Sequence, residues 1–195
     1  MNRRRLLAWY RVLILGIVGL MGLVTLAASR GPAPVQRFFH PLRYAAEIGR
    51  SARGNSVDPF LVAGIVRVES GFDPQIISRQ GAVGLMQVLP STASDLRKRG
   101  GRAAVTVTAA DLKSPSANIE FGTEYLADLL RRFEDTRTAL AAYNAGPATV
   151  HRWLARPGGG KITYADVAFP ETRRYVKRVL SEAYYYRRLY PEAFK

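Results

Sequence analysis

The sequence of 195 residues contains no cysteine and only two histidines, His40 and His151. Without cysteine the chain can form neither a disulfide nor a catalytic thiolate, and it cannot carry a lipid-modified cysteine anchor. A Ser-His-Asp triad or a histidine-based metal site would depend on His151 alone. We therefore expect no metal and no cofactor, and carboxylates remain as the catalytic groups.

Acidic residues are also scarce: 15 Asp and Glu stand against 29 Lys and Arg, which gives a formal net charge of +14. A domain of this charge is attracted to polyanions. The positive charges are spread along the chain and no nucleic-acid-binding motif accompanies them, so we expect no nucleic-acid partner. Anionic cell-wall polymers and lipid head groups are the partners that this charge favours.

The N-terminal segment is basic and then strongly apolar. Arg3 to Arg5 are followed, after Arg11, by the uncharged run Val12–Ala28. This order is typical of a secretory signal, but the run is nearly long enough for a membrane-spanning anchor. The small residues 27–29 leave cleavage open. We expect residues 1–29 to be a signal peptide or inner-membrane anchor, with the N-terminus in the cytoplasm and the remainder exported to the periplasm.

The rest of the chain predicts a linker followed by one mostly α domain. Residues 30–41 contain three prolines and a glycine, which is typical of a linker, and residues 42–195 have room for one domain. Helical spacing and caps predict helices over about 42–48, 59–69, 91–98, 118–133, 138–144, 147–153 and 171–190. Residues 71–87 are expected to form a loop or short hairpin, and residues 157–160 a flexible loop.

Glu69 stands out among the carboxylates. It follows the apolar residues Ile65, Val66 and Val68 and precedes Gly71, so it is placed where a helix ends and a glycine-rich loop begins. Apolar neighbours disfavour the charged carboxylate, so we expect a raised pKa. A carboxylic acid that keeps its proton near neutral pH can protonate a glycosidic oxygen. Taken alone, the position also fits an ordinary surface residue at a helix end.

Four segments, in this order, resemble one known family. They are VESGFDPQIISRQGAVGLMQVLPSTA, NIEFGTEYL, ALAAYNAGPATVHRW and FPETRRYV. Together they look like the catalytic domain of the soluble lytic murein transglycosylases, which are related to the goose-type lysozymes. The resemblance covers about residues 42–186. It implies a lysozyme-like α domain with a catalytic cleft.

The resemblance also implies roles for individual residues. Glu69 matches the catalytic acid/base, and the other matched positions border or line the sugar-binding cleft: Ser70, Gly84, Leu85, Met86, Gln87, Tyr143, Asn144, Glu171 and Tyr175. Leu89 stands where the family pattern has methionine before the proline. Without the resemblance, residues 81–87 would fit a plain tight turn, Tyr143 core packing, and Glu171 a first-turn helix acid.

The implied reaction cleaves the β-1,4 bond between N-acetylmuramic acid and N-acetylglucosamine in peptidoglycan and leaves a 1,6-anhydro-muramoyl end. Most glycosidases need two carboxylates, but the motifs offer only Glu69, which suits a substrate-assisted route. Two alternatives remain: a lysozyme-like muramidase that admits water, and a non-catalytic peptidoglycan-binding module. The intact Glu69 argues against the binding module. A partner in a cell-wall or secretion assembly stays unidentified.

Overall fold

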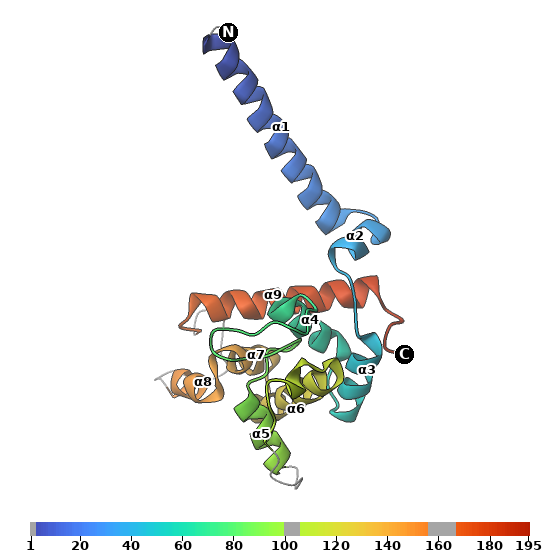
Figure 1. Ribbon diagram of the computed structural model, residues 1–195, viewed down its shortest axis with the longest axis vertical. Coiled ribbons are helices and arrows are strands. Elements are labelled where there is room, and N and C mark those ends of the chain that lie inside the picture. The colour runs from blue at the N-terminus through green and yellow to red at the C-terminus, as the bar shows by residue number, and fades with distance from the viewer. Residues whose placement is uncertain (1–2, 100–105, 156–166) are drawn as a thin grey trace. The chain divides into compact units, whose positions relative to one another are not determined.

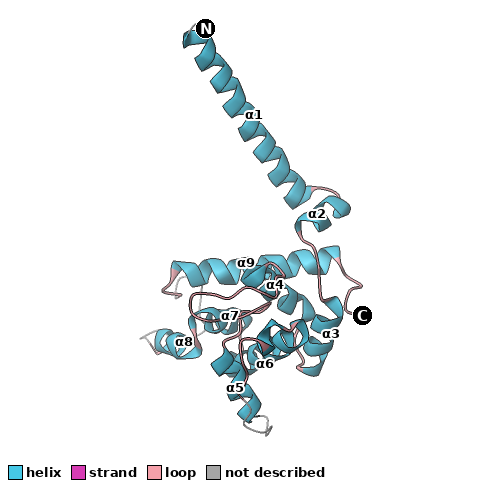
Figure 2. Cartoon of the chain, viewed as in Figure 1, coloured by secondary structure: helices cyan, strands magenta, loops and turns pink. Residues whose placement is uncertain are grey.

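The computed structural model describes residues 3–99, 106–155 and 167–195. Within these ranges the regular structure is helical, and Figure 2 shows helices joined by loops. Extended pairing among the described residues is limited to two isolated antiparallel bridges, Ile77 with Val83 and Val83 with Val88. Both bridges lie in or just after the segment for which the sequence predicts a loop or hairpin. The prediction of a mostly α chain is confirmed.

Internal contacts divide the chain into two units, one ending at Pro41 and one beginning at Leu42. The first unit holds α1 (Arg3–Arg30) and α2 (Ala33–Phe39). Within α1, the stretch Trp9–Ala27 is long and apolar enough to cross a membrane, and none of it is buried. The segment expected as a linker, residues 30–41, thus contains the short helix α2, whose Pro34 stands in the first turn where proline is tolerated.

The central helix of the second unit is α4 (Pro59–Ser70). The Asp58 side chain caps it by accepting a hydrogen bond from the Phe60 N–H at 3.1 Å, and Pro59 occupies the first turn. Gly71 ends it in the left-handed region, with φ of +61°. The sequence predicts both ends of this helix correctly. Eight of the twelve residues of α4 are buried and the others are half-buried, so packing holds the helix that carries Glu69 in its last turn.

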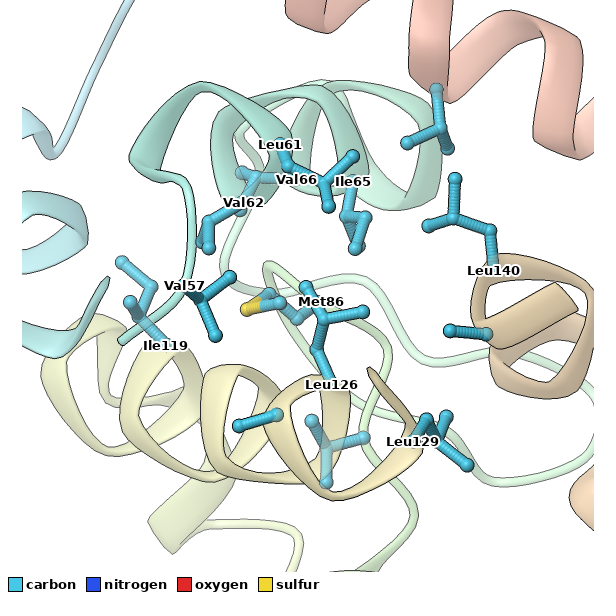
Figure 3. Packing of buried hydrophobic residues seen from close by; sticks show 14 of the residues in the cluster. Val57, Leu61, Val62, Ile65, Val66, Met86, Ile119, Leu126, Leu129 and Leu140 are labelled. Atoms are coloured by element: carbon cyan, nitrogen blue, oxygen red, sulfur yellow. The ribbon is translucent and has the colours of Figure 1, made fainter. Parts of the chain in front are cut away.

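The other elements surround α4. They are α3 (Ala45–Gly54), α5 (Pro90–Arg99), the 3-10 turn η1 (Asp111–Lys113), α6 (Pro115–Phe133), α7 (Thr136–Ala145), α8 (Pro147–Leu154) and α9 (Pro170–Leu189) (Figure 1). The long helix α9 packs along α4, while α6 packs against α3, α5 and α7. Figure 3 shows apolar side chains of α4, α6 and α7 converging around Met86, whose side chain is fully buried.

Several helices begin earlier or later than the sequence predicts. The first helix of this unit begins at Ala45 rather than Leu42, because Tyr44 has a left-handed backbone with φ of 56°. Helix α6 begins three residues before Asn118, at Pro115, and α7 begins at Thr136 behind an Asp135 cap. The loop expected at 157–160 lies outside the described residues.

The crossing of α4 and α9 depends on a residue without a side chain, which gives a first prediction. A Cβ placed on Gly64 would lie 2.7 Å from the Val179 carbonyl oxygen on α9. Because backbone cannot yield as a flexible side chain does, we expect Gly64→Ala to cost about 1–3 kcal/mol of unfolding free energy, measured by chemical denaturation. Gly54→Ala is the control, since nothing lies within 4 Å of its added Cβ. Equal stability of the two variants would contradict the prediction.

Candidate active site

The last turn of α4 opens onto a groove of about 500 Å³. This volume is in the range of small-molecule and substrate sites. The groove is bounded by the end of α4, the 78–92 segment, α6, the end of α7 and the start of α9. Its lining consists of Glu69, Ser78, Gln80, Ala82, Gln87, Val88, Leu89, Thr92, Tyr125, Tyr143, Asn144, Ala145, Gly146 and Glu171.

Glu69 is the titrating group of this groove. Burial raises its pKa from 4.5 to about 7, while a contact with the Tyr175 hydroxyl and the positive charge of Arg178 lower it by smaller amounts. The direction agrees with the expectation from the apolar residues that precede Glu69. Near neutral pH a substantial fraction of Glu69 is therefore protonated, as a proton donor requires.

Tyr175, on α9, places its buried hydroxyl beside Glu69. The hydroxyl is close enough to lower the pKa of Glu69 as a donor, although the pair falls outside strict hydrogen-bond geometry. It has no other hydrogen-bond partner among the described residues. Burial, and then the charge of Glu69, raise the pKa of Tyr175 itself well above 10. Tyr175 thus remains a neutral donor beside the Glu69 carboxyl.

Tyr143, on α7, lines the same groove as Glu69 and is held in place by contacts with its neighbours. Its hydroxyl donates a hydrogen bond of 2.8 Å to the Met86 carbonyl oxygen. Its ring lies 5.3 Å from that of Tyr125, with the planes tilted by 49°. Burial, and then the charge of Glu69, raise the pKa of Tyr143 well above 10. The tyrosine therefore connects the neighbourhood of Glu69 to the backbone of the 84–88 loop.

Gln87 and Val88 of the 84–88 loop line the groove, whereas the side chains of Leu85 and Met86 are fully buried. Gly84 and Gln87 both have positive φ, of 74° and 48°. The Gln87 amide nitrogen donates to the Gly84 carbonyl at 3.0 Å and to the Ile76 carbonyl at 3.2 Å. Its amide oxygen makes no hydrogen bond within the described part of the chain. Gln87 therefore offers the groove a hydrogen-bond acceptor.

Asn118, on α6, holds this loop from behind. Its Oδ1 accepts a hydrogen bond of 2.7 Å from the Met86 N–H, and its Nδ2 donates to the carbonyl oxygens of Val83 (2.7 Å) and Leu112 (2.8 Å). The side chain is fully buried. Gly84 leaves room for it, because a Cβ at that position would lie 2.5 Å from the Asn118 Nδ2.

Asn144 and Glu171 complete the groove at the junction of α7 and α9. The Asn144 Oδ1 accepts a hydrogen bond of 2.8 Å from the Thr172 hydroxyl, which ties the end of α7 to the start of α9. Glu171 lies in the first turn of α9 and its side chain is exposed. It is not among the groups that shift the pKa of Glu69.

Five of the residues predicted for the site line one groove: Glu69, Gln87, Tyr143, Asn144 and Glu171. Tyr175 does not line the groove but interacts with the Glu69 carboxyl through its hydroxyl. These residues come from helices and a loop far apart in sequence, and the fold brings them together.

Four of the predicted substrate-binding residues are not among those that line the groove: Ser70, Gly84, Met86 and Tyr175. Ser70 is buried, and its Oγ bridges the Leu85 carbonyl (2.9 Å), the Val66 carbonyl (3.1 Å) and the Phe72 N–H (3.2 Å). The Met86 side chain packs against Gly122 in the core. These residues shape the loop, and so does Leu85, which is fully buried.

Sequence reasoning assigned no role to Tyr125, Ser78 or Asn118. The first two line the groove, and Asn118 supports it. Asn118 and Tyr125 belong to the NIEFGTEYL segment, seven residues apart and hence close to the same face of α6. The sequence signal for Asn118 is a polar residue among the buried, mostly apolar residues of α6. Among the described residues no group of three potential metal ligands occurs.

Comparison with known proteins agrees with this arrangement. The family model described as "Transglycosylase SLT domain" matches residues 47–165. The soluble lytic murein transglycosylase of Salmonella typhimurium is 37% identical over 160 residues, which are 75% of this chain and 23% of that protein. Membrane-bound lytic murein transglycosylase C of Haemophilus influenzae is 30% identical, over 73% of this chain and 41% of that protein.

A solved structure is similar in fold as well as in sequence. It is the lytic transglycosylase Slt of Pseudomonas aeruginosa, crystallised as an inactive glutamate-to-glutamine mutant. The match has a TM-score of 0.69 and 30% identity, and covers 85% of this chain and 27% of that one. The chain thus spans about a quarter of the length of the soluble relatives it matches.

Proposed function

The chain belongs to the transglycosylase SLT domain family, and on that premise we propose that it is a peptidoglycan lytic transglycosylase with Glu69 as its acid and then its base. The observation that carries the proposal is the burial of Glu69 in a groove, which raises its pKa to about 7. The Pseudomonas relative supports the proposal, because a mutant of that protein with one glutamate replaced by glutamine is inactive.

In the proposed reaction, protonated Glu69 gives its proton to the oxygen between N-acetylmuramic acid and N-acetylglucosamine. The bond from that oxygen to the muramoyl anomeric carbon breaks, and the muramoyl 2-acetamido oxygen stabilises the positive carbon. The Glu69 carboxylate then takes the proton of the muramoyl 6-hydroxyl. The 6-oxygen bonds to the anomeric carbon, the acetamido group is released, and a 1,6-anhydro ring closes without water.

The remaining groups of the groove support each step. Tyr175 donates toward Glu69 and so favours the carboxylate that the second step needs, while burial favours the acid that the first step needs. Gln87 offers an acceptor to a sugar hydroxyl or amide N–H. Glu171, the other carboxylate that lines the groove, is exposed and does not shift Glu69, which suits contact with the sugar better than a nucleophile's role.

The chemical form of the product tests the proposal most directly. We expect mass spectrometry of digested peptidoglycan to show muropeptides with 1,6-anhydro ends, each lighter by one water molecule than the reducing sugar of a hydrolase. Reducing muramic acid ends would establish a muramidase instead. Binding to peptidoglycan without any release of muropeptides would establish a non-catalytic module.

The pH dependence of the rate gives a second prediction. Because the first step needs the protonated acid, we expect kcat/KM to fall above the pKa of Glu69, at about pH 7, and to approach a tenfold loss for each further pH unit. Initial rates on purified peptidoglycan, with circular dichroism as a check on folding, measure it. A rate that keeps rising through pH 8 would contradict the assignment of Glu69 as the acid.

The fall in rate above pH 7 is the alkaline limb of the pH profile. Removing a positive charge near Glu69 tests whether this limb reports the pKa of Glu69. Arg178 lowers the pKa of Glu69, so Arg178→Gln should move the alkaline limb to higher pH. Lys195→Gln removes the same charge from a side chain that pairs with Glu192 at the C-terminus, and serves as the control. Equal profiles for the two variants would show that the limb belongs to another group.

We further propose that the enzyme works outside the cytoplasmic membrane, on peptidoglycan, with residues 1–29 as signal peptide or anchor. The apolar stretch of α1 and the existence of membrane-bound relatives support this location. Fractionation of cells that express the full chain, followed by mass determination of the recovered protein, distinguishes an anchored form from a cleaved one.

A further inference from the structure

Helix α2 exposes an apolar face directly after α1. Val35, Phe38 and Phe39 follow the i, i+3, i+4 spacing that places side chains on one face of a helix. Phe38 is 80% exposed and Val35 is 38% exposed. The Phe38 ring contacts protein through the edge of Phe39, with centroids 5.4 Å apart. Exposed apolar side chains that gather on one face, rather than lie scattered singly, mark a surface for an apolar partner.

The position of α2 in the sequence indicates that this apolar partner is the membrane. The stretch able to cross a membrane ends at Ala27, Arg30 follows, and α2 begins at Ala33. Only Gly31 and Pro32 separate the two helices, so the start of α2 lies within about 10 Å of the end of α1. A helix that close to the end of a membrane-spanning segment is at the level of the lipid head groups.

The aromatic residues of this unit have the distribution of a membrane protein. Trp9 and Tyr10 mark the N-terminal end of the apolar stretch, and both are exposed. From Arg11 to Arg30 the sequence has no aromatic residue. Phe38 and Phe39 are the first aromatic residues after the stretch. Membrane-spanning helices are enriched in Trp and Tyr at both interfaces, and α1 has them at its N-terminal end only. Phenylalanine is typical of the apolar face of a helix that lies in the interface.

We infer that α2 is an interfacial helix, with Val35, Phe38 and Phe39 inserted into the outer leaflet of the membrane that α1 spans. Ala33 and Arg37, on the opposite face, point toward water and head groups. A short helix whose apolar side is buried at the boundary of head groups and acyl chains is a known mode of membrane attachment. Because Leu42 follows α2 after two residues, the catalytic unit would begin within a few residues of the membrane surface.

The absence of cysteine allows a sharp test, since one introduced cysteine takes one label. The full chain is reconstituted into phosphatidylethanolamine–phosphatidylglycerol vesicles as three variants, each with an environment-sensitive fluorophore: Phe38→Cys, Ala33→Cys on the opposite face, and Leu20→Cys in the middle of α1. Nitroxide-labelled lipids act as quenchers. We expect quenching at position 38 to exceed that at position 33 by about twofold or more.

Each other outcome has a definite meaning. Strong quenching at position 20 with equal quenching at 33 and 38 overturns the interfacial helix and leaves the anchor intact. Blue-shifted emission at 38 without lipid quenching also overturns it, because protein then covers Phe38. No quenching at position 20 removes the anchor, and the inference with it. Muropeptide release by the same variants is read separately, so failure of the proposed catalysis is distinguishable from failure here.

Discussion

Replacing Glu69 with glutamine should abolish most of the muropeptide release and at the same time make the protein more stable. The substitution keeps the size of the side chain and removes the proton that titrates near pH 7. General acid–base groups contribute about 10²–10⁴ in rate. Because Glu69 serves as both acid and base in the proposed reaction, we expect the loss to lie toward the upper end. Rates of muropeptide release measure it.

The expected gain in stability follows from the sign of the pKa shift. The folded pKa of about 7 lies above the ordinary value of 4.5. Below pH 4.5 both the folded and unfolded states hold the proton, so Glu69 contributes nothing to the pH dependence. Between 4.5 and 7 the unfolded chain ionises first, and the folded state loses stability as pH rises. Above pH 7 the cost stays constant, at up to about 3 kcal/mol, since each pKa unit corresponds to about 1.4 kcal/mol.

Denaturant titrations of Glu69→Gln and wild type should therefore coincide at pH 4 and separate at pH 8, with the variant more stable by about 1–3 kcal/mol. Glu192→Gln is the matched control, because Glu192 is exposed near the C-terminus and pairs only with Lys195. A Glu69→Gln variant that keeps full activity would remove Glu69 from the mechanism. A variant that unfolds would instead assign the residue a structural role.

The sequence predicts the position of Glu69 well because the signals are local. The Asp58–Pro59 start, the apolar run and Gly71 fix both ends of α4, and no distant contact is needed to place the carboxyl at the last turn. The apolar residues before Glu69 also predict the direction of its pKa shift. The boundaries of α3 and α6 are less accurate because Tyr44 and Pro115 act through backbone geometry that a hydrophobic pattern does not report.

The sequence does not predict which side chains of the 84–88 loop face the groove and which are buried. A short segment of Gly, Leu, Met and Gln has no period, so the pattern does not say which side chains face the groove. The face is set by Asn118, 32 residues after Met86, through the hydrogen bond to the Met86 N–H. Such a long-range contact carries no local signal, so the sequence alone shows neither that Ser70, Gly84 and Met86 are buried nor that Asn118 holds the loop.

Asn118→Ala should accordingly be the most destabilising of the substitutions considered. It takes away the hydrogen-bond partner of the Met86 N–H and the Asn118 amide that donates to the Leu112 carbonyl, while the Val83 carbonyl still accepts from the Val88 N–H. Each unsatisfied buried group costs about 1–3 kcal/mol, so we expect the two groups together to lower the unfolding free energy by about 2–6 kcal/mol. Asn55→Ala is the control, since the Asn55 side chain donates one hydrogen bond, to the Ser51 carbonyl at the end of α3. Denaturant unfolding of both variants measures the difference.

The same substitution should reduce activity even where the protein is still folded. The loop that Asn118 holds carries Gln87 into the groove and supplies the Met86 carbonyl to which Tyr143 donates. Without the hydrogen bond to the Met86 N–H, the loop that positions both Gln87 and Tyr143 loses its support from α6. Substrate binding and turnover should therefore weaken together, although Asn118 itself does not line the groove. At a temperature where Asn118→Ala remains folded, we expect a lower kcat/KM with the alkaline limb still near pH 7, because Glu69 and Tyr175 stay in place. A folded variant with wild-type kcat/KM would show that the loop keeps its shape without this asparagine.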